Sequence, residues 1–395
     1  MTFLSRLLGT AKRGAPPATA VTDHIDRALS AAGLDRAGDA GGIRATIDRA
    51  LAAAGLRAPQ PGSVVDVAPA PAPASRPATP APPAARRDAQ APDATHSGGR
   101  FLRATYANAH GRREYRLYLP ADYDAGAAPR PLVVMLHGCT QSAEDFAAGT
   151  RMNALADRHG FLVAYPQQAG KANHAKCWNW FRPADQNGDA GEPSVLAGIA
   201  RQVADDHRVD RERIFVAGLS AGAAMAVILG RTHPGLVRAI GVHSGLPYAS
   251  AHDVPSAFAA MQTGAAARTG TPARGGTGPG VPVIVFHGDE DRTVAPPNAD
   301  AIVADARHPP LSTRAETGRA PGGRAYTRQI AVDDAGRPWL ERWTVHGAGH
   351  AWSGGDPSGS YTDPTGPDAS AAMVDFFLRQ GARPSQGPVA APMRR

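Results

Sequence analysis

A serine between two glycines is the strongest chemical signal in this sequence. Ser220 lies in GLSAG (218–222), directly after the apolar run at 214–217 and before a short Ala-rich stretch. Where a sharp turn joins a strand to a helix, the serine hydroxyl stands clear of the sheet, and glycine on both sides lets helix and strand approach closely. A helix N-terminus beneath the serine also favours developing negative charge. The pattern predicts that Ser220 is a catalytic nucleophile.

A serine nucleophile needs a general base, and the base needs an orienting acid. After a strand–serine–helix turn of this kind, the acid and then the histidine come later in the chain. Downstream of Ser220, one apolar run ends in FHGDEDRTV (286–294), which places an acid in a loop at the carboxyl end of a strand. Asp289, Glu290 and Asp291 compete for this role. The sequence alone does not separate Asp289 from Asp291.

The base is expected in VHGAGHAW (345–352), which closes the last apolar run. His346 would still belong to a strand. His350 follows a Gly-Ala-Gly bend that lets it swing over the serine, so we predict His350 as the general base. The other downstream histidines are interpreted as structural or surface residues: His233, His243, His252, His287 and His308.

Two backbone N–H groups must hold the negative oxygen that forms during acyl transfer. Ala221, the residue after the nucleophile, is expected to supply one of them. The loop LHGCTQ (136–141) follows an earlier apolar run and suits the second, because Gly138 lets the chain turn its amides inward. Cys139 would then be the second donor.

The elements that must position these residues alternate along the chain. This alternation predicts an α/β fold with a mostly parallel central sheet flanked by helices, and ligands in such sheets bind beyond the carboxyl ends of the strands. We expect strands at 113–119, 132–136, 161–165, 214–217, 239–242, 283–286, 327–332 and 340–345, and helices at 142–158, 193–207, 221–231 and 369–378.

Composition divides the 395 residues into unequal parts. The segment 25–34 returns with small changes as 47–56, and each copy carries one apolar helical stripe. The next stretch holds ten prolines and no aromatic ring, which is typical of a disordered linker. We predict an N-terminal segment of two short amphipathic helices at 1–56, a Pro/Ala-rich linker at 57–98, a catalytic domain at 99–382 and a basic flexible tail at 383–395.

The formal charge of +7 argues less for an acidic partner than it first suggests. Residues 99–382 contain 28 Lys and Arg against 27 Asp and Glu, so the excess lies at the two ends of the chain. A nearly neutral domain is not expected to bind nucleic acid. No apolar run reaches the ~20 residues that a membrane span needs. Residues 1–13 do not follow the order of a secretory signal.

Five motifs, in this order, resemble the catalytic domain of the poly-3-hydroxybutyrate (PHB) depolymerase family of esterases: LHGCTQ (136–141), CWNWF (177–181), GLSAG (218–222), FHGDEDRTV (286–294) and GHAWSGG (349–355). The resemblance covers about residues 113–380. It implies an α/β-hydrolase fold, a serine esterase, Asp291 as the acid of the HGxxDxxV pattern and His350 as the base of GHxW. It also favours a secreted protein, with a cytoplasmic location as the alternative.

We therefore expect a serine esterase that hydrolyses short hydroxyalkanoate esters or their oligomers. A feruloyl or acetyl-xylan esterase of the same fold is the alternative within the enzyme class. In a different class, the chain would be a non-catalytic binder of polyester granules. The N-terminal helices are expected to pair, to dock on the core or to meet a hydrophobic surface.

Two cysteines and three tryptophans surround the predicted site. A Cys139–Cys177 bridge would close a loop of about 38 residues and stabilise the fold by roughly 3–4 kcal/mol, but a cytoplasmic chain would keep both thiols reduced. The sequence leaves the bridge open. Trp178, Trp180 and Trp352 are expected to form an apolar wall for an acyl chain or an aromatic ring, with plain packing as the alternative.

One acidic loop imitates a calcium site. DQNGD (185–189) matches the first half of a calcium-binding loop, but Ala190 stands at the sixth position and Leu196 at the twelfth. These positions need glycine and glutamate. We expect a polar loop there, with no metal, and no cofactor for the protein.

Overall fold

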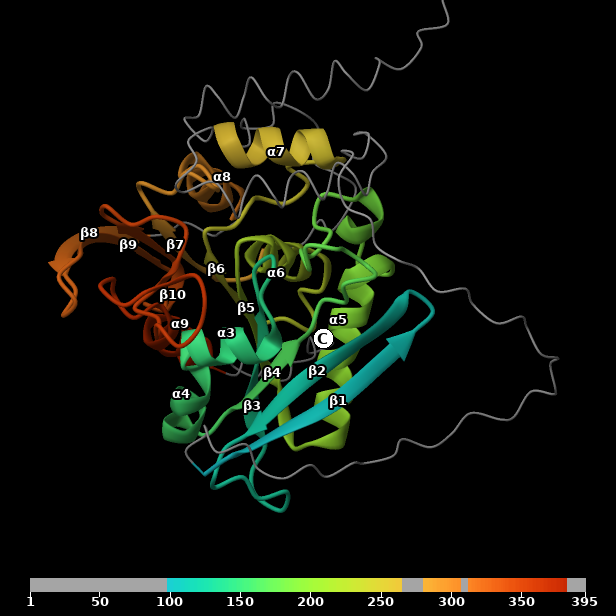
Figure 1. The fold of residues 1–395 in the computed structure, drawn as a ribbon. Coiled ribbons are helices and arrows are strands. Elements are labelled where there is room, and N and C mark those ends of the chain that lie inside the picture. The colour runs from blue at the N-terminus through green and yellow to red at the C-terminus, as the bar shows by residue number, and fades with distance from the viewer. Residues whose placement is uncertain (1–97, 265–279, 307–311, 382–395) are drawn as a thin grey trace, which may run out of the picture. The chain divides into compact units, whose positions relative to one another are not determined.

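The computed structural model describes residues 98–264, 280–306 and 312–381 (Figure 1). The predicted N-terminal helices, nearly all of the predicted linker at 57–98 and the predicted tail at 383–395 lie outside the described residues. No helix in the described ranges is both long and apolar enough to cross a membrane.

A large twisted sheet organises these residues. It has ten strands in the order β1-β2-β4-β3-β5-β6-β7-β10-β9-β8. The neighbours from β4 to β10 run parallel, whereas the two edges add antiparallel strands. The strands are β1 (Arg100–Asn108), β2 (Gly111–Leu119), β3 (Arg130–Leu136), β4 (Leu162–Pro166), β5 (Val209–Leu219), β6 (Ala239–His243), β7 (Val283–Gly288), β8 (Ser312–Arg319), β9 (Ala325–Val332) and β10 (Pro338–Val345).

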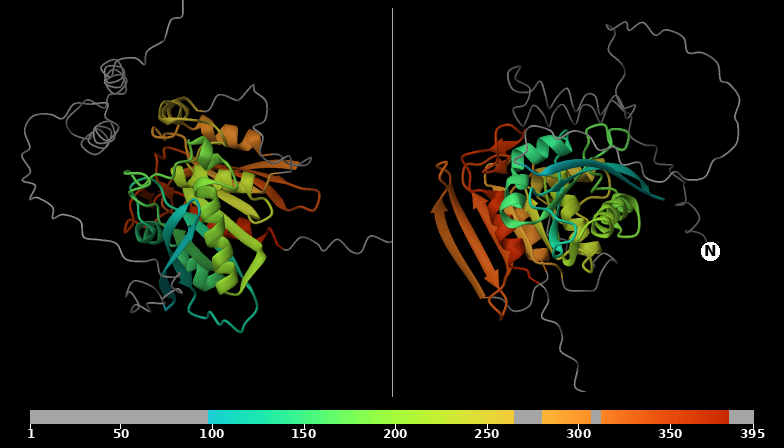
Figure 2. Two further views of the ribbon diagram at one scale, coloured as in Figure 1. Left: turned by 90° about the vertical axis from the view of Figure 1, so that its right-hand side faces the viewer. Right: turned by 90° about the horizontal axis from the view of Figure 1, so that it is seen from below.

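Helices cover both faces of the sheet (Figures 1 and 2). One apolar cluster joins the sheet to α5 (Gly191–Asp206), α6 (Ala221–Thr232), α7 (Val254–Thr263) and α8 (Pro297–Asp305). The other joins it to α3 (Ala143–Thr150), α4 (Met152–His159) and α9 (Ala369–Leu378). A 3-10 helix (Pro183–Gln186) and a small sheet of β11 (Trp352–Ser353) and β12 (Thr362–Asp363) complete the described elements.

The central strands are apolar throughout because both of their faces are buried. In β3, Val134 and Leu136 pack into the cluster of α5 and α6, whereas Val133 and Met135 pack into the cluster of α3, α4 and α9. A strand with helices on both sides reads as a continuous apolar run rather than as an alternating one. The prediction of an α/β fold with a mostly parallel sheet is confirmed.

Several element predictions need correction. The single helix expected at 142–158 is two helices, because Arg151 takes the left-handed conformation (φ 53°) and ends α3. Its side chain donates to the Gly354 carbonyl oxygen at 2.7 Å, which fixes this break. The strands β1 and β8 and the helices α7 and α8 were not predicted. The strand β8 is exposed along nearly its whole length, so it carries no apolar signal.

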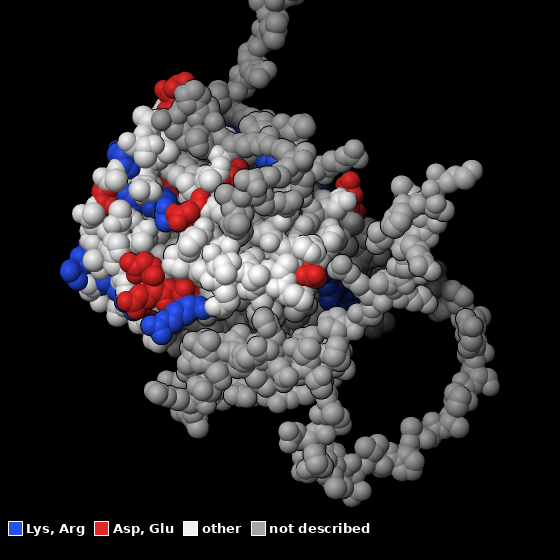
Figure 3. All heavy atoms as spheres, turned by 90° about the horizontal axis from the view of Figure 1, so that it is seen from above, with Lys and Arg blue, Asp and Glu red and all other residues white. Residues whose placement is uncertain are grey.

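The side of the sheet that carries α7 and α8, which follow the carboxyl ends of β6 and β7, has few charges at its centre. Figure 3 shows this side: its described residues in view are mostly uncharged, and most of the Lys, Arg, Asp and Glu lie toward the left, with a few toward the right. This is the side on which the sequence places the chemistry.

Candidate active site

Ser220 occupies a strained turn between β5 and α6. Its backbone is at φ 56° and ψ −120°, and its N–H donates to the His243 carbonyl oxygen at 2.9 Å. A Cβ on Gly222 would lie 2.1 Å from the Leu136 carbonyl oxygen, and one on Gly218 would lie 2.5 Å from the Gly222 carbonyl carbon. Both glycines are therefore required by close backbone approach. Strain of this kind is found where a side chain must be presented at a site.

An acid and a base meet at the carboxyl ends of β7 and β10. His350 Nδ1 lies 2.7 Å from Asp291 Oδ2. The other carboxylate oxygen, Oδ1, accepts the backbone N–H groups of Thr293 and Val294, each at 2.9 Å. The Asp291 side chain has no exposed surface and the His350 side chain is 12% exposed. These bonds fix the carboxylate and, through it, the orientation of the imidazole.

The electrostatics keep Asp291 ionised. Burial alone would raise the pKa of its carboxyl. The hydrogen bond and charge of His350 and the N–H of Val294 outweigh burial, so the pKa of Asp291 lies below its ordinary value. An ionised partner stabilises the imidazolium that forms when a histidine accepts a proton.

The structure separates the two aspartates that the sequence leaves open. Asp289 pairs with His346 instead, at 2.8 Å between Oδ2 and Nδ1, and also accepts the Gly347 N–H at 2.7 Å. His346 Nε2 lies 2.9 Å from the Thr327 hydroxyl oxygen. His346 follows the last residue of β10.

Two backbone N–H groups near the serine turn are candidates for binding an oxyanion. Among the described residues, neither the Cys139 N–H nor the Ala221 N–H has a hydrogen-bond acceptor. The register pairs Leu136 of β3 with Gly218 of β5, so the loop after β3 lies beside the serine turn. This arrangement suits a pair of oxyanion donors.

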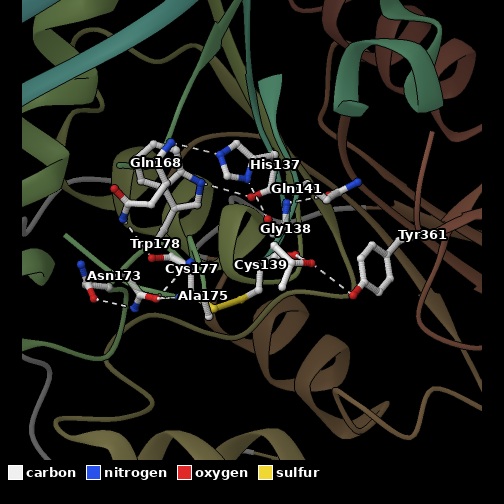
Figure 4. The surroundings of a disulfide bond; sticks show 12 residues. His137, Gly138, Cys139, Gln141, Gln168, Asn173, Ala175, Cys177, Trp178 and Tyr361 are labelled. Carbon is white, nitrogen blue, oxygen red and sulfur yellow. Dashed lines mark hydrogen bonds between the residues drawn. A yellow bond between two sulfur atoms is a disulfide. The ribbon is translucent and has the colours of Figure 1, made fainter. Parts of the chain in front are cut away.

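Side chains hold the loop 137–141, which we call the oxyanion loop, from several directions (Figure 4). The Gly138 N–H donates to Gln141 Oε1 at 2.9 Å, and Trp178 Nε1 donates to the His137 carbonyl oxygen at 3.1 Å. Gln141 Nε2 in turn donates to Asp145 Oδ2 at 2.9 Å. The loop is therefore fixed before any substrate binds, which is what an oxyanion site requires.

His137 contributes as a neutral structural residue. Its Nε2 accepts the Gln168 N–H at 3.1 Å, so the ring proton is on Nδ1, which donates to the Gly138 carbonyl oxygen at 2.7 Å. Burial lowers the pKa of His137 to about 4. The ring thus stays in one tautomer at neutral pH and ties the oxyanion loop to the segment after β4.

His243 plays a similar part under the serine. Its Nε2 accepts the Ser353 N–H at 3.0 Å, and its carbonyl oxygen accepts the Ser220 N–H. Burial lowers the pKa of His243 to about 3. A neutral His243 therefore links the nucleophile turn to the segment that follows His350.

A disulfide joins Cys139 to Cys177, 38 residues apart (Figure 4). The neighbouring residue Thr140 donates its N–H to the Ala175 carbonyl oxygen at 2.7 Å, so the two segments also meet through their backbones. A bridge over a loop of this length stabilises a fold by roughly 4 kcal/mol in the chain-entropy account. It also fixes Cys139, whose N–H is one of the two candidate oxyanion donors.

A buried glutamate anchors the loop that carries Cys177. Glu192 Oε2 accepts the Asn179 N–H at 2.7 Å, and Oε1 accepts from Asn179 Nδ2 at 2.8 Å and from Gln168 Nε2 at 2.5 Å. Arg113 supplies the compensating charge at 3.0 Å. Sequence reasoning missed Glu192, because nothing in its neighbours marks it, and it missed Gln141 although Gln141 ends the LHGCTQ motif.

The three tryptophans do not form the wall that was predicted. Trp178 and Trp352 are fully buried, at 0% and 1% exposure, and Trp180 is 5% exposed. Trp352 packs in the cluster with α3, α4 and α9, where its Nε1 donates to the Ser370 hydroxyl oxygen at 3.0 Å. Trp178 supports the oxyanion loop from beneath. The three tryptophan rings pack in the apolar clusters, because the motifs that contain them pass through the core.

The acidic loop at 185–189 holds a helix in place. Asp185 is buried, and its Oδ1 accepts the Glu192 N–H at 2.7 Å near the start of α5. Within the described ranges, no three His, Cys, Asp or Glu side chains are grouped to hold a metal ion.

The fold and the serine, histidine and aspartate at the strand ends are those of an α/β-hydrolase. Residues 113–311 match the family described as Esterase PHB depolymerase, and the chain belongs to this family. It is 34% identical over 241 residues to poly(3-hydroxyalkanoate) depolymerase C of Paucimonas lemoignei, covering 59% of this chain and 57% of that protein. It is 28% identical over 275 residues to poly(3-hydroxybutyrate) depolymerase of Ralstonia pickettii, covering 65% and 56%.

Other similar proteins are named for different ester substrates. Feruloyl esterase B of Thermothelomyces thermophilus is 29% identical over 197 residues, covering 47% of this chain and 66% of that protein. The solved structure of acetyl xylan esterase from Aspergillus awamori matches with a TM-score of 0.51 at 19% identity, over 68% of this chain and 94% of that one, and so shows a common fold. The chain spans a little over half the length of the depolymerases that it matches.

Proposed function

We propose that the protein is a serine esterase with Ser220, His350 and Asp291 as its catalytic triad. The observation that carries the proposal is the buried Asp291–His350 hydrogen bond of 2.7 Å after β7, two strands along the sheet from the turn after β5 that holds Ser220 at φ 56°. Membership of the PHB depolymerase family supports the same reaction class.

The reaction follows from the positions of these groups. Ser220 Oγ attacks the ester carbonyl carbon while His350 Nε2 takes the hydroxyl proton, and Asp291 stabilises the resulting imidazolium. The N–H groups of Cys139 and Ala221 hold the oxyanion. His350 then protonates the leaving alcohol, and an acyl-enzyme forms on Ser220. A water molecule, activated by His350, releases the acid and restores the serine.

We propose short hydroxyalkanoate esters and their oligomers as the substrate class. The named depolymerases are the relatives that support this choice. The uncharged centre of the described surface in Figure 3 is consistent with a neutral polyester chain rather than an acidic ligand. Feruloyl and acetylxylan esters are the competing class, because a feruloyl esterase and a probable acetylxylan esterase are also similar to this chain.

An ester panel on wild type and Ser220→Ala tests the reaction and the substrate class together. Loss of the nucleophile in a serine hydrolase lowers kcat by up to ~10⁶-fold, so Ser220→Ala should leave almost no hydrolysis of p-nitrophenyl butyrate. Ser312→Ala, an exposed serine at the start of β8, is the control and should keep wild-type turnover. Retained hydrolysis in Ser220→Ala would refute the proposed triad. A higher kcat/KM for methyl ferulate than for 3-hydroxybutyrate trimer would overturn the substrate class.

We also propose that the protein works outside the reducing cytoplasm. The support is the Cys139–Cys177 disulfide beside the reacting serine, since bridges of this kind persist in oxidising compartments. Thiol labelling of the protein in intact and lysed cells tests this. Two free thiols in freshly quenched cells would contradict it.

A further inference from the structure

One large aromatic side chain stands out beside the oxyanion loop. Tyr361 is 48% exposed, whereas the tryptophans that were expected to line the site are buried. It lies between β11 and β12, and its backbone is at φ 52°, in the left-handed region that residues with a Cβ avoid. Glycine would fit this position without strain. Strained residues of this kind cluster at functional sites, which makes Tyr361 a candidate for a functional role.

A chain of hydrogen bonds places Tyr361 on the rim of the site. The Trp352 N–H donates to the Tyr361 carbonyl oxygen at 2.7 Å, and Trp352 lies two residues after His350. On its other side, the Tyr361 hydroxyl lies 3.3 Å from Thr140 Oγ1, next to the oxyanion donor Cys139. Tyr361 thus bridges the segment after the base and the loop of the oxyanion donor, and Figure 4 shows it at the edge of that loop.

The hydroxyl groups settle the direction of this bridge. Thr140 Oγ1 donates its proton to the Cys139 carbonyl oxygen at 2.6 Å. Tyr361 is therefore the donor toward Thr140. This bond holds the tip of the ring, and Trp352 holds the Tyr361 backbone, yet the residue remains 48% exposed.

The neighbouring residue prevents the segment from swinging away. The Ser360 N–H donates to Asp145 Oδ1 at 2.8 Å, and its hydroxyl donates to Asp145 Oδ2 at 2.6 Å. Gln141, which holds the oxyanion loop, also donates to the Ser360 carbonyl oxygen at 3.1 Å. The same polar cluster thus fixes the oxyanion loop and the base of the Tyr361 ring. A rigid aromatic surface binds a chain without first losing its own conformational freedom.

We propose that Tyr361 is a specificity-determining residue whose ring packs against the part of an ester chain that extends beyond the scissile bond. This inference rests on the proposed esterase function. The occupant is an aliphatic or hydroxyacyl chain of several carbon atoms, because a half-exposed tyrosine ring offers an apolar face. On this proposal, a two-carbon acyl group does not depend on contact with the ring, so it serves as the comparison.

Kinetics on short and long esters test the assignment. The full chain and its variants are assayed with p-nitrophenyl acetate as the short ester, and with p-nitrophenyl octanoate and 3-hydroxybutyrate trimer as the long esters. Tyr361→Gly removes the ring and also relieves the left-handed backbone, so the variant is expected to fold. It should raise KM for the long esters about tenfold, which is ~1.4 kcal/mol, and change both constants for p-nitrophenyl acetate less than twofold.

Two further variants separate chain binding from a structural role. Tyr361→Phe keeps the ring and should leave all KM values within about twofold. Tyr123→Ala removes a partly exposed tyrosine from the loop before β3, at the opposite end of that strand from the loop 137–141, and should also leave the KM values unchanged. The assignment fails if Tyr361→Gly leaves long-ester KM within twofold, if it lowers kcat equally for short and long esters, or if wild type takes neither long ester. A wild type that fails to hydrolyse p-nitrophenyl acetate would instead contradict the esterase function.

Discussion

Two Asp–His pairs join the same two loops of this protein, and their hydrogen bonds are almost equal in length. Asp291 and His350 lie 2.7 Å apart, and Asp289 and His346 lie 2.8 Å apart. Their surroundings differ. The side chains of the first pair are 0% and 12% exposed, whereas those of the second are 39% and 43% exposed. Hydrogen-bond length therefore does not distinguish the two pairs, whereas burial and the remaining contacts do.

The remaining contacts give each histidine a different freedom. His346 Nε2 is engaged by the Thr327 hydroxyl on β9. Among the described residues, His350 makes its side-chain hydrogen bond through Nδ1 and none through Nε2. Nε2 is therefore the nitrogen that we expect to accept the serine proton. Gly288 makes this geometry possible, because a Cβ there would lie 2.2 Å from the Ala348 carbonyl oxygen. The exposed outer pair, Asp289 and His346, holds the two loops together. The buried inner pair, Asp291 and His350, is the one that we propose for catalysis.

The largest difference between the two pairs is expected in the kcat values of matched asparagine variants. In Asp291→Asn the histidine loses its ionised partner and its tautomer preference, and kcat for p-nitrophenyl butyrate should fall by about 10⁴-fold. In Asp289→Asn, two residues away, kcat should stay within about threefold of wild type. Equal losses in the two variants would show that the outer pair also supports the reacting histidine.

A smaller difference between the two pairs is expected in the loss of unfolding free energy at acid pH. The pKa of Asp291 is lowered in the folded protein, as burial is outweighed by His350, so its carboxylate stabilises the fold above the unfolded value of ~3.9 and this contribution is lost as the pH falls through the lower folded value. Urea unfolding at pH 6 and pH 3 should therefore show a smaller loss of stability in Asp291→Asn than in wild type.

The outer carboxylate supplies the comparison for this measurement. The pKa of Asp289 is also lowered, since the hydrogen bonds of His346 and Gly347 outweigh burial. Solvent screens this exposed pair, so Asp289→Asn should change the pH dependence less than Asp291→Asn does. The reverse order would contradict the assignment of the inner pair as the electrostatically important one.

The smallest difference between the two pairs is expected in how salt changes the coupling free energy within each pair. A double-mutant cycle with Asp289→Asn and His346→Gln at pH 6 should yield a coupling free energy of about 0.5 kcal/mol or less at low salt. In 1 M NaCl, where the Debye length is about 3 Å, that coupling should approach zero. The corresponding cycle for Asp291 and His350 should keep its coupling in both salts. Salt-resistant coupling in the outer pair would show that it behaves as a buried pair.

The turn that carries Ser220 and the central strands could be predicted because their sequence signals are local. GLSAG after an apolar run specifies its turn within five consecutive residues, and glycine there is required by the backbone itself. Central strands such as β3 are apolar on both faces, which leaves a clear signal. The antiparallel edge strand β8 is exposed and polar, and so leaves none. The break at Arg151 depends on Gly354, some two hundred residues later, which no local pattern reveals.

The sequence by itself determined the fold class, the nucleophile turn and a short set of acids and histidines for the other roles, because each depends on neighbours along the chain. The tertiary structure decided the pairing of Asp291 with His350, the burial of Trp178 and Trp352, the disulfide and the place of Tyr361. The physical reason is distance along the chain: these outcomes depend on which segments the sheet brings together. The register of β7 beside β10 sets the two Asp–His pairs, and residue composition does not encode it directly.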